Sequence, residues 1–269
     1  MNEGAILRMQ RIFREDGKAV IVAADHGAIA GPLKGIESPR ELVRICAEGG
    51  ADAILAHRGF VRAGFEAWKR QLGLVLRASG GFTTLGGRFE EELIASAEDA
   101  LRWAADAVAI TVKFGHAREG EFIRNAARLI SACEPFGMPV MIEAMAFEKG
   151  EFSTRADALA IAVRAAEEIG AAFVKAAMPQ SIDDFVQIAH GTHVPIVLLG
   201  GERTDSLAAL FESIARAMDL GASGVAMGRN IWGQDNPREI LEAVVGLVHG
   251  GLNMDAVLGR FSYNQRSGQ

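Results

Sequence analysis

Residues 171–179 read AAFVKAAMP, an apolar run with one charged side chain, Lys175, in its middle. The segment before it, residues 154–169, has apolar residues at helical spacing, and Gly170 separates the two. An apolar run that follows a helix and ends at a proline is typical of a buried strand in a parallel sheet. The stretch therefore predicts alternating helices and strands, with Lys175 buried in a strand.

The same alternation of apolar strand, loop and amphipathic helix recurs along the whole chain. The predicted strands are residues 19–24, 53–56, 74–76, 107–112, 139–142, 172–175, 195–199 and 224–227. The predicted helices are residues 39–48, 90–105, 119–133, 154–169, 181–189, 205–219 and 237–247. Eight strands alternating with helices predict an α/β fold, a (β/α)8 TIM barrel, and a doubly wound sheet is the alternative. We expect one domain over residues 1–261 and a flexible tail at 262–269.

Composition excludes several classes of function. Of 269 residues, 49% are hydrophobic and 23% are charged, with a formal net charge of −6. These values fit a soluble globular protein without a basic surface for nucleic acid. No signal peptide or long apolar span is apparent, so we expect no membrane contact. Cys46 and Cys133 fall in predicted helices and imply no disulfide framework, which favours a cytoplasmic location.

Polar residues follow most of the predicted strands, at the end where a (β/α)8 barrel carries its chemistry. These residues are Asp25, His26, His57, Arg58, Arg77, Lys113, Glu143 and Lys175. An isolated ammonium is costly to bury and tends to become neutral, and a neutral lysine amine forms a Schiff base with a carbonyl compound. Lys175 is therefore the predicted nucleophile. The alternative is a lysine that pairs with a carboxylate or extends to solvent.

Two carboxylates are candidates for proton transfer. Asp25 stands where the first strand ends, and Glu143 follows an apolar strand, which predicts a raised pKa. The alternatives are a turn-forming Asp25 beside a satisfied His26, and an ion pair of Glu143 with Lys175 or Lys113. Lys113 is expected to hold substrate oxygens or to favour the neutral amine of Lys175.

The loops after the last two strands predict a phosphate site. Gly200, Gly201 and Gly228 let the backbone approach an anion, and Arg229 adds a fork of donors. In (β/α)8 barrels the loops after strands seven and eight are a frequent phosphate position. No histidine or cysteine cluster has zinc spacing, so no metal is predicted. We expect a phosphorylated small molecule as the substrate.

Five motifs together resemble class I aldolases of the archaeal fructose-bisphosphate aldolase type. They are ADHG (24–27), GPLKGIES (31–38), VKAAMP (174–179), VLLGGERT (197–204) and GASGVAMGRNIWGQDNP (221–237). The same superfamily includes a thiolase for phosphorylated autoinducer-2 and 2-amino-3,7-dideoxy-heptulosonate synthase. The resemblance covers nearly the whole chain, and RASG (77–80) looks nearest to the thiolase.

The resemblance implies a (β/α)8 barrel with a Schiff base on Lys175, acid–base chemistry at Asp25 and phosphate binding by the glycines and Arg229. It also implies a homo-oligomer, often a decamer. Fructose-bisphosphate aldolases of this type have a tyrosine where this chain has Met145, and a second histidine where it has Ala30. These departures argue against fructose 1,6-bisphosphate as the substrate. Glu143 resembles a glutamate of the tagatose-bisphosphate-type aldolases.

We therefore expect a class I aldolase, a lyase that makes or breaks a carbon–carbon bond in a phosphorylated ketose or dicarbonyl sugar. It would need no cofactor beyond the Schiff base on Lys175. One alternative is a thiolase that transfers an acyl group from a phosphorylated dicarbonyl to coenzyme A. Another is a barrel that binds a sugar phosphate without catalysis.

Overall fold

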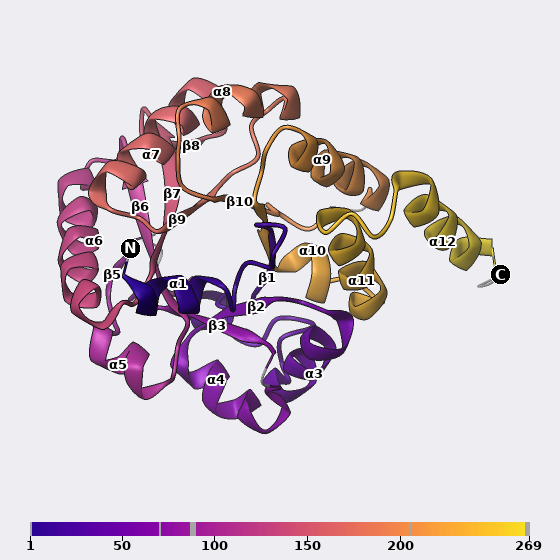
Figure 1. The fold of residues 1–269 in the computed structure, drawn as a ribbon, viewed down its shortest axis with the longest axis horizontal. Helices are drawn as coiled ribbons and strands as arrows, with labels where there is room; N and C mark the ends of the chain where they lie inside the picture. The colour runs from indigo at the N-terminus through magenta and orange to yellow at the C-terminus, as the bar shows by residue number, and fades with distance from the viewer. Residues whose placement is uncertain (1, 70, 87–89, 205, 267–269) are drawn as a thin grey trace.

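A closed parallel barrel forms the centre of the molecule (Figure 1). The computed structural model describes residues 2–69, 71–86, 90–204 and 206–266. The barrel strands are β1 (Ala19–Ala23), β2 (Ala53–Ala56), β3 (Gly73–Arg77), β6 (Ala107–Phe114), β7 (Val140–Glu148), β9 (Phe173–Ala176), β10 (Ile196–Leu199) and β11 (Gly224–Met227). Parallel pairing of β1 with β11 and of β6 with β7 closes the sheet. The predicted (β/α)8 barrel is confirmed, and the doubly wound alternative is wrong.

Helices surround the barrel (Figure 1). The longer ones are α1 (Glu3–Met9), α3 (Pro39–Gly49), α4 (Arg58–Gly64), α5 (Ala97–Arg102), α6 (Glu119–Cys133), α7 (Ala156–Ile169), α8 (Phe185–His190), α9 (Leu207–Asp219), α11 (Pro237–Val248) and α12 (Met254–Arg266). Single turns form α2 (Gly27–Ala30), α10 (Arg229–Trp232) and the 3-10 helices η1 (Phe65–Ala67), η2 (Glu134–Phe136) and η3 (Ile182–Asp184). Ser38 and Ser206 cap α3 and α9 by accepting hydrogen bonds from backbone N–H groups.

The predicted helix at residues 90–105 is wrong in its first half. Ser96 and Asp99 form a capping box that begins α5 at Ala97. The residues before it form strand β5 (Glu92–Leu93), which pairs antiparallel with β4 (Ser79–Gly80). A similar hairpin joins β7 to β8 (Glu151–Ser153). Two short hairpins therefore extend beyond the barrel.

The end of the chain was expected to form a flexible tail from residue 262. Helix α12 continues through Arg266, and residues 267–269 lie outside the described part of the chain. In Figure 1, α12 lies at the periphery beyond α9 and α11. The proposed domain limits stay a prediction.

Two apolar shells stabilise the fold. One lies between strands and helices, and the other fills the barrel interior, where small residues such as Ala23, Ala53 and Ala109 let the opposed strands approach. Ile12 and Phe13 belong to this inner shell and close the amino-terminal end of the barrel. Chemistry is thereby confined to the opposite end, where the strands terminate.

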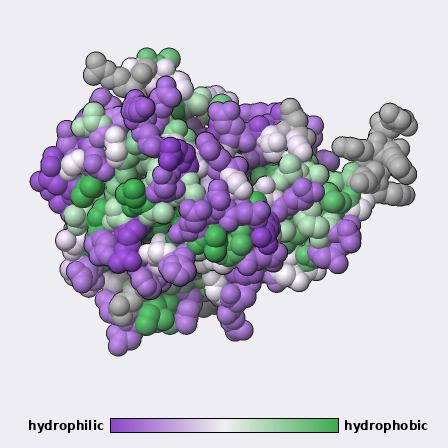
Figure 2. All heavy atoms as spheres, turned by 90° about the horizontal axis from the view of Figure 1, so that it is seen from above, coloured by the Kyte–Doolittle hydropathy of each residue, from purple (hydrophilic) through white to green (hydrophobic). Residues whose placement is uncertain are grey.

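The face of the molecule in Figure 2 is mainly polar. Figure 2 shows one side of the molecule, where hydrophilic residues predominate and apolar side chains form separate small patches. Within the described ranges, no helix has both the length and the apolar character needed to cross a membrane.

Candidate active site

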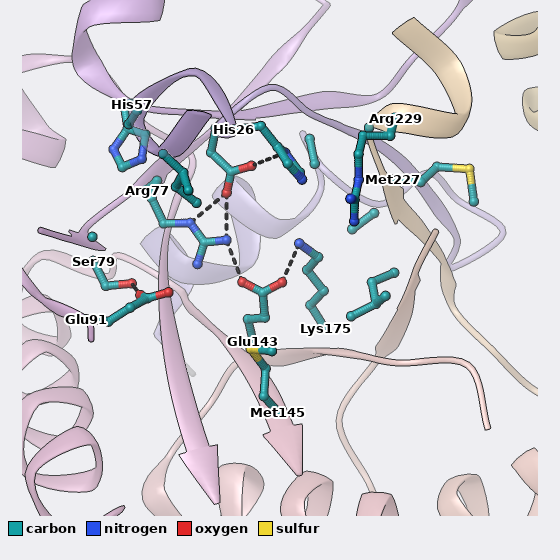
Figure 3. Close-up of a pocket in the computed structure, with 18 of the residues that line it drawn as sticks. His26, His57, Arg77, Ser79, Glu91, Glu143, Met145, Lys175, Met227 and Arg229 are labelled. Carbon is teal, nitrogen blue, oxygen red and sulfur yellow. Dashed lines mark hydrogen bonds and ion pairs between the residues drawn. The ribbon is translucent and has the colours of Figure 1, made fainter. Parts of the chain in front are cut away.

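A cavity of about 440 Å³ opens where the barrel strands end. Lys175, Glu143, Arg77 and Asp25 line it; Lys175, Arg77 and Asp25 are buried, and the Glu143 side chain is 12% exposed. Figure 3 shows Arg77, Glu143 and Lys175 side by side at the centre of the cavity. The structure therefore brings together the three residues predicted to be catalytic and adds an arginine between them.

Strand periodicity explains why these side chains meet. Side chains along a strand alternate between its two faces, so residues two apart share a face. Phe173 belongs to the interior shell, and Lys175 follows it two residues later on β9. Glu143 stands in the same relation to Met141 on β7. Each side chain thus continues the inward row of its strand into the cavity.

Five side chains form one continuous polar network, part of which is drawn in Figure 3. Lys175 Nζ lies 2.6 Å from Glu143 Oε1, and Arg77 Nη2 lies 2.5 Å from Glu143 Oε2. Arg77 Nε donates to Asp25 Oδ2 at 2.8 Å, so the guanidinium bridges both carboxylates. Thr111 Oγ1 accepts from Arg77 at 2.9 Å and donates to Glu143 at 3.0 Å. Arg77 and Thr111 thereby fix Glu143 so that its other oxygen faces Lys175.

The prediction of a raised pKa for Glu143 is wrong. Burial alone would raise the pKa, but the neighbouring Lys175 and Arg77 lower it to about 2. For Asp25, burial also opposes ionisation, and Arg77 and His26 hold its pKa well below the usual range. Lys175 is accordingly not a lone ammonium, and the alternative of pairing with a carboxylate is observed. Both carboxylates are ionised at neutral pH.

The four residues predicted to bind phosphate line the same cavity. Gly201 has a φ of +67°, a left-handed conformation that suits glycine. A Cβ at Gly228 would lie only 2.3 Å from the carbonyl oxygen of Ala23, so a larger residue would not fit. Arg229 Nε is buried and has no hydrogen-bond partner among the described residues. A guanidinium with an unsatisfied donor is suited to an anionic ligand.

Asn230 holds the two glycine loops together and was missed in the sequence. It is buried, and its amide donates to the carbonyl oxygens of Gly200 at 2.6 Å and Glu202 at 2.9 Å. Its side-chain oxygen accepts from the backbone N–H of Thr204 at 2.7 Å. One side chain on α10 therefore fixes the loop after β10.

The other two predicted substrate-binding residues differ in position. His26 lines the cavity, with Nδ1 3.3 Å from Asp25 Oδ1. Lys113 is fully buried beside the cavity, and its ammonium lies over the rings of Phe82 and Phe122 at 5.6 and 5.5 Å. Burial lowers the pKa of Lys113 to about 8, against the opposing effect of nearby glutamates. Lys113 is therefore not part of the cavity wall as the structure describes it.

His57, Ser79 and Glu91 also line the cavity. Burial lowers the pKa of His57 to about 4, so its imidazole is neutral at neutral pH. Ser79 Oγ donates to Glu91 Oε2, and both side chains are buried. The sequence placed His57 and Arg77 after predicted strands without assigning them a role. Glu91 lies within the predicted helix at residues 90–105, so the sequence pattern did not indicate that it lines the cavity.

The cysteines and the remaining histidines lie away from the cavity. Cys46 and Cys133 are free and buried, as expected for reduced thiols. His193 pairs with Glu167 at 3.0 Å. Among the residues that the structure describes, no group of three or more histidine, cysteine, aspartate or glutamate side chains could hold a metal ion. That the reaction needs no metal stays a prediction.

Comparison with known proteins gives the family. The model of the DeoC/LacD family aldolases matches residues 19–234. The chain belongs to the DeoC/LacD aldolase family. It is therefore a class I aldolase-type enzyme, as predicted.

Relatives of this aldolase family member carry different activities. The 3-hydroxy-5-phosphonooxypentane-2,4-dione thiolase of Klebsiella pneumoniae is 37% identical over 91% of this chain and 81% of its own. The 2-amino-3,7-dideoxy-D-threo-hept-6-ulosonate synthase 1 of Archaeoglobus fulgidus is 30% identical over 93% of both chains. An archaeal fructose 1,6-bisphosphate aldolase has a similar structure, with a TM-score of 0.83, 25% identity and coverage of 91% of this chain and 99% of that one.

Another structure of an archaeal fructose-1,6-bisphosphate aldolase, with the same TM-score of 0.83, has its catalytic lysine covalently bound to a carbinolamine intermediate. The relatives thus include enzymes named for aldol chemistry and for thiolysis.

Proposed function

We propose that this enzyme makes or breaks a carbon–carbon bond in a phosphorylated ketose or dicarbonyl compound through an iminium on Lys175. The observation that carries the proposal is the contact of the Lys175 amine with Glu143, within a cavity that also holds the glycine loops and Arg229. Among the described residues, Lys175 is the lysine that lines this cavity. An amine with an adjacent proton acceptor is the arrangement that activates a lysine nucleophile.

The first step is the activation of the amine. The Lys175 ammonium passes a proton to Glu143 Oε1 across the 2.6 Å contact, and the ion pair becomes a neutral amine and a carboxylic acid. The amine attacks the substrate carbonyl to give a carbinolamine. Glu143, now a carboxylic acid, returns the proton to the carbinolamine hydroxyl, which leaves as water. The product of these transfers is the iminium.

The second step is the transfer of a proton during carbon–carbon bond cleavage. The iminium withdraws the electron pair of the breaking bond, and a base removes the hydroxyl proton of the carbon that becomes a carbonyl. Asp25 and Glu143 are both ionised and both line the cavity, so either carboxylate is a candidate for this base. Arg77 binds both of them and limits their movement.

The phosphate of the substrate would bind at the loops after β10 and β11. Gly200, Gly201 and Gly228 let the backbone approach the phosphate oxygens, and the buried Nε of Arg229 supplies a charged donor. Asn230 keeps the loop after β10 in place. These features support a phosphorylated substrate, in agreement with the phosphorylated compound that names the Klebsiella relative.

A thiolase is the second candidate function, with coenzyme A as its cosubstrate. Two observations favour it: the 37% identity to the Klebsiella thiolase, and Met145 in the cavity lining where the archaeal-type aldolases carry a tyrosine. The third alternative, a barrel without catalysis, is disfavoured by membership in an enzyme family.

Borohydride reduction in the presence of phosphorylated ketoses tests the proposal. We expect a covalent adduct on Lys175 in wild type and none in Lys175→Met, as read by mass spectrometry of the peptides. Lys113→Met is the matched control, because Lys113 is also buried but lies outside the cavity wall, and it should keep the adduct. Binding without an adduct would refute the iminium. Consumption of coenzyme A with a phosphorylated dicarbonyl would then assign the thiolase activity.

The assembly and the location of the enzyme are further proposals. The resemblance to the archaeal-type aldolases, which are often decamers, supports a homo-oligomer. Light scattering coupled to size-exclusion chromatography measures the mass directly. A cytoplasmic location is supported by the two free, buried cysteines.

A further inference from the structure

The cavity has a second end, away from the glycine loops. In Figure 3, His57, Ser79 and Glu91 lie on one side of Arg77, and Arg229 lies on the other. The proposed phosphate site and the lysine occupy the Arg229 side and the centre. A substrate fixed by its phosphate and its carbonyl carbon would extend its remaining carbons past Arg77 toward Ser79 and Glu91.

A small hairpin builds this second end. Strands β4 and β5 pair Ser79 with Leu93 and Gly80 with Glu92, and Ile94 N donates to the carbonyl oxygen of Ala78 at 2.8 Å. The pairing places Glu91, the residue before β5, beside Ser79. The sequence here has a helical pattern, and the chain forms a strand instead. This local departure brings a carboxylate into the cavity.

The hydrogen bonds and charge of the Ser79–Glu91 pair determine which kind of ligand group can bind beside it. The Ser79 hydroxyl donates its hydrogen to Glu91 and accepts from the backbone N–H of Thr111 at 3.0 Å. An ionised carboxylate is an acceptor only, so a ligand at Glu91 must present a hydrogen. Glu91 is 7% exposed, and a buried negative charge repels a phosphate group. A neutral His57 adds one donor and one acceptor without adding charge.

We infer that Ser79, Glu91 and His57 form a subsite that recognises a hydroxyl group at the phosphate-distal end of the substrate and rejects a second phosphate there. This inference rests on the proposed function, because the phosphate and the iminium set the orientation of the substrate. It narrows the substrate to a monophosphate with a free hydroxyl at the opposite end. Glu91 and Ser79 are specificity residues in this role.

Three ketose 1-phosphates that differ only at carbon 6 test the subsite: fructose 1-phosphate, 6-deoxyfructose 1-phosphate and fructose 1,6-bisphosphate. The readout is borohydride trapping on Lys175 as a function of ketose concentration, which does not depend on turnover. A hydrogen bond to a charged group is worth about a tenfold to a hundredfold preference. We expect wild type to trap fructose 1-phosphate at a lower concentration than it needs to trap 6-deoxyfructose 1-phosphate or fructose 1,6-bisphosphate. The concentrations should differ by that factor.

Variants of the pair should remove this discrimination. Glu91→Ala should trap the 6-hydroxy and 6-deoxy compounds at nearly equal concentrations, and Glu91→Gln, which removes the charge, should improve trapping of the bisphosphate about tenfold or more. Glu92→Gln is the matched control, since Glu92 is the next residue, is exposed and pairs with Arg118 at 2.8 Å. It should behave as wild type.

The outcomes separate the two proposals. Equal trapping of all three compounds by wild type, or discrimination that Glu91→Ala leaves unchanged, would overturn the subsite and leave the Schiff base intact. A failure of wild type to trap any of the three would overturn the proposed iminium on ketose phosphates, and the subsite with it. Should Glu91→Ala not fold, Ser79→Ala provides the same comparison, because it removes the hydroxyl that orients the carboxylate.

Discussion

Replacing Lys175 with methionine should abolish trapping and turnover while the barrel stays folded. Methionine nearly preserves the volume of the lysine stem, so the packing on β9 changes little. The variant lacks the amine in contact with Glu143, and with it the group that would bond to the substrate carbonyl. Phosphate affinity should be retained, because the glycine loops and Arg229 belong to other strands.

The contacts of Glu143 also determine how much stability the Lys175→Met variant should lose. Removing one partner of a buried ion pair costs about 3–5 kcal/mol when the other charge is left without partners. Here Glu143 Oε2 keeps Arg77 at 2.5 Å and Thr111 at 3.0 Å, and only Oε1 loses its partner. We therefore expect a smaller loss, about 1–3 kcal/mol, close to the penalty for one unsatisfied buried acceptor. For a chain of this size that corresponds to a fall in Tm of roughly 2–12 °C.

Three measurements on the same protein check this reasoning: a thermal melt, a titration with inorganic phosphate and borohydride trapping. The double variant Lys175→Met with Glu143→Gln removes the uncompensated charge and should melt above the single variant. A Lys175→Met protein that keeps substantial activity would refute the Schiff base. A double variant that melts below the single one would refute the assigned cause of the instability.

Three further changes have definite expected outcomes. Arg229→Ala should raise KM for a phosphorylated substrate about tenfold to a hundredfold more than KM for its dephosphorylated analogue. An equal rise in KM for both substrates would show that Arg229 has only a structural role. Glu143→Gln should slow both trapping and turnover, because the ammonium of Lys175 loses its proton acceptor; rapid trapping would exclude Glu143 from the activation step. His249 contacts Asp52 at 3.0 Å, and hydrogen bonds to its carboxylate partners raise its pKa although burial opposes the charge. The stability that the His249 contacts contribute should be fully present below a pH of about 6.5 and should be lost as the pH rises through the raised pKa of His249. The melting temperatures of wild type and His249→Gln should therefore converge at alkaline pH.

The fold could be predicted from the sequence because its determinants are local. Most barrel strands are short apolar runs, and the longer helices have a stripe of apolar residues. Some of these helices also begin with a cap or a proline, as at Ser38 and Pro39. The segment at residues 90–105 is the exception. Its pattern suits a helix, but β4 offers a pairing edge, and the capping box at Ser96 delays the helix. Tertiary pairing overrode local preference there.

The candidate site was predicted only in part, because charge partners are not local. Lys175 was identified by its place within an apolar run and Asp25 by its place after one, and both are local signals. The pKa of Glu143 depends on Arg77, which lies 66 residues away in the sequence, and Arg77 reaches Asp25 across 52 residues. No pattern within one strand reveals such a partner. The error in the predicted pKa of Glu143 followed directly from treating it as an isolated buried acid.

Strand parity would have recovered part of what was missed. Counting every second residue from the interior positions Val75 and Ala109 reaches Arg77 and Thr111, so both fall on the inward face where their strands end. The same count from Met141 reaches Glu143, which places an arginine, a hydroxyl and a carboxylate on neighbouring strands of one closed barrel. Opposite charges brought to one buried ring must pair, because each alone would be costly to bury. A paired Glu143 with a low pKa is thus a consequence of the barrel itself, once the fold is known.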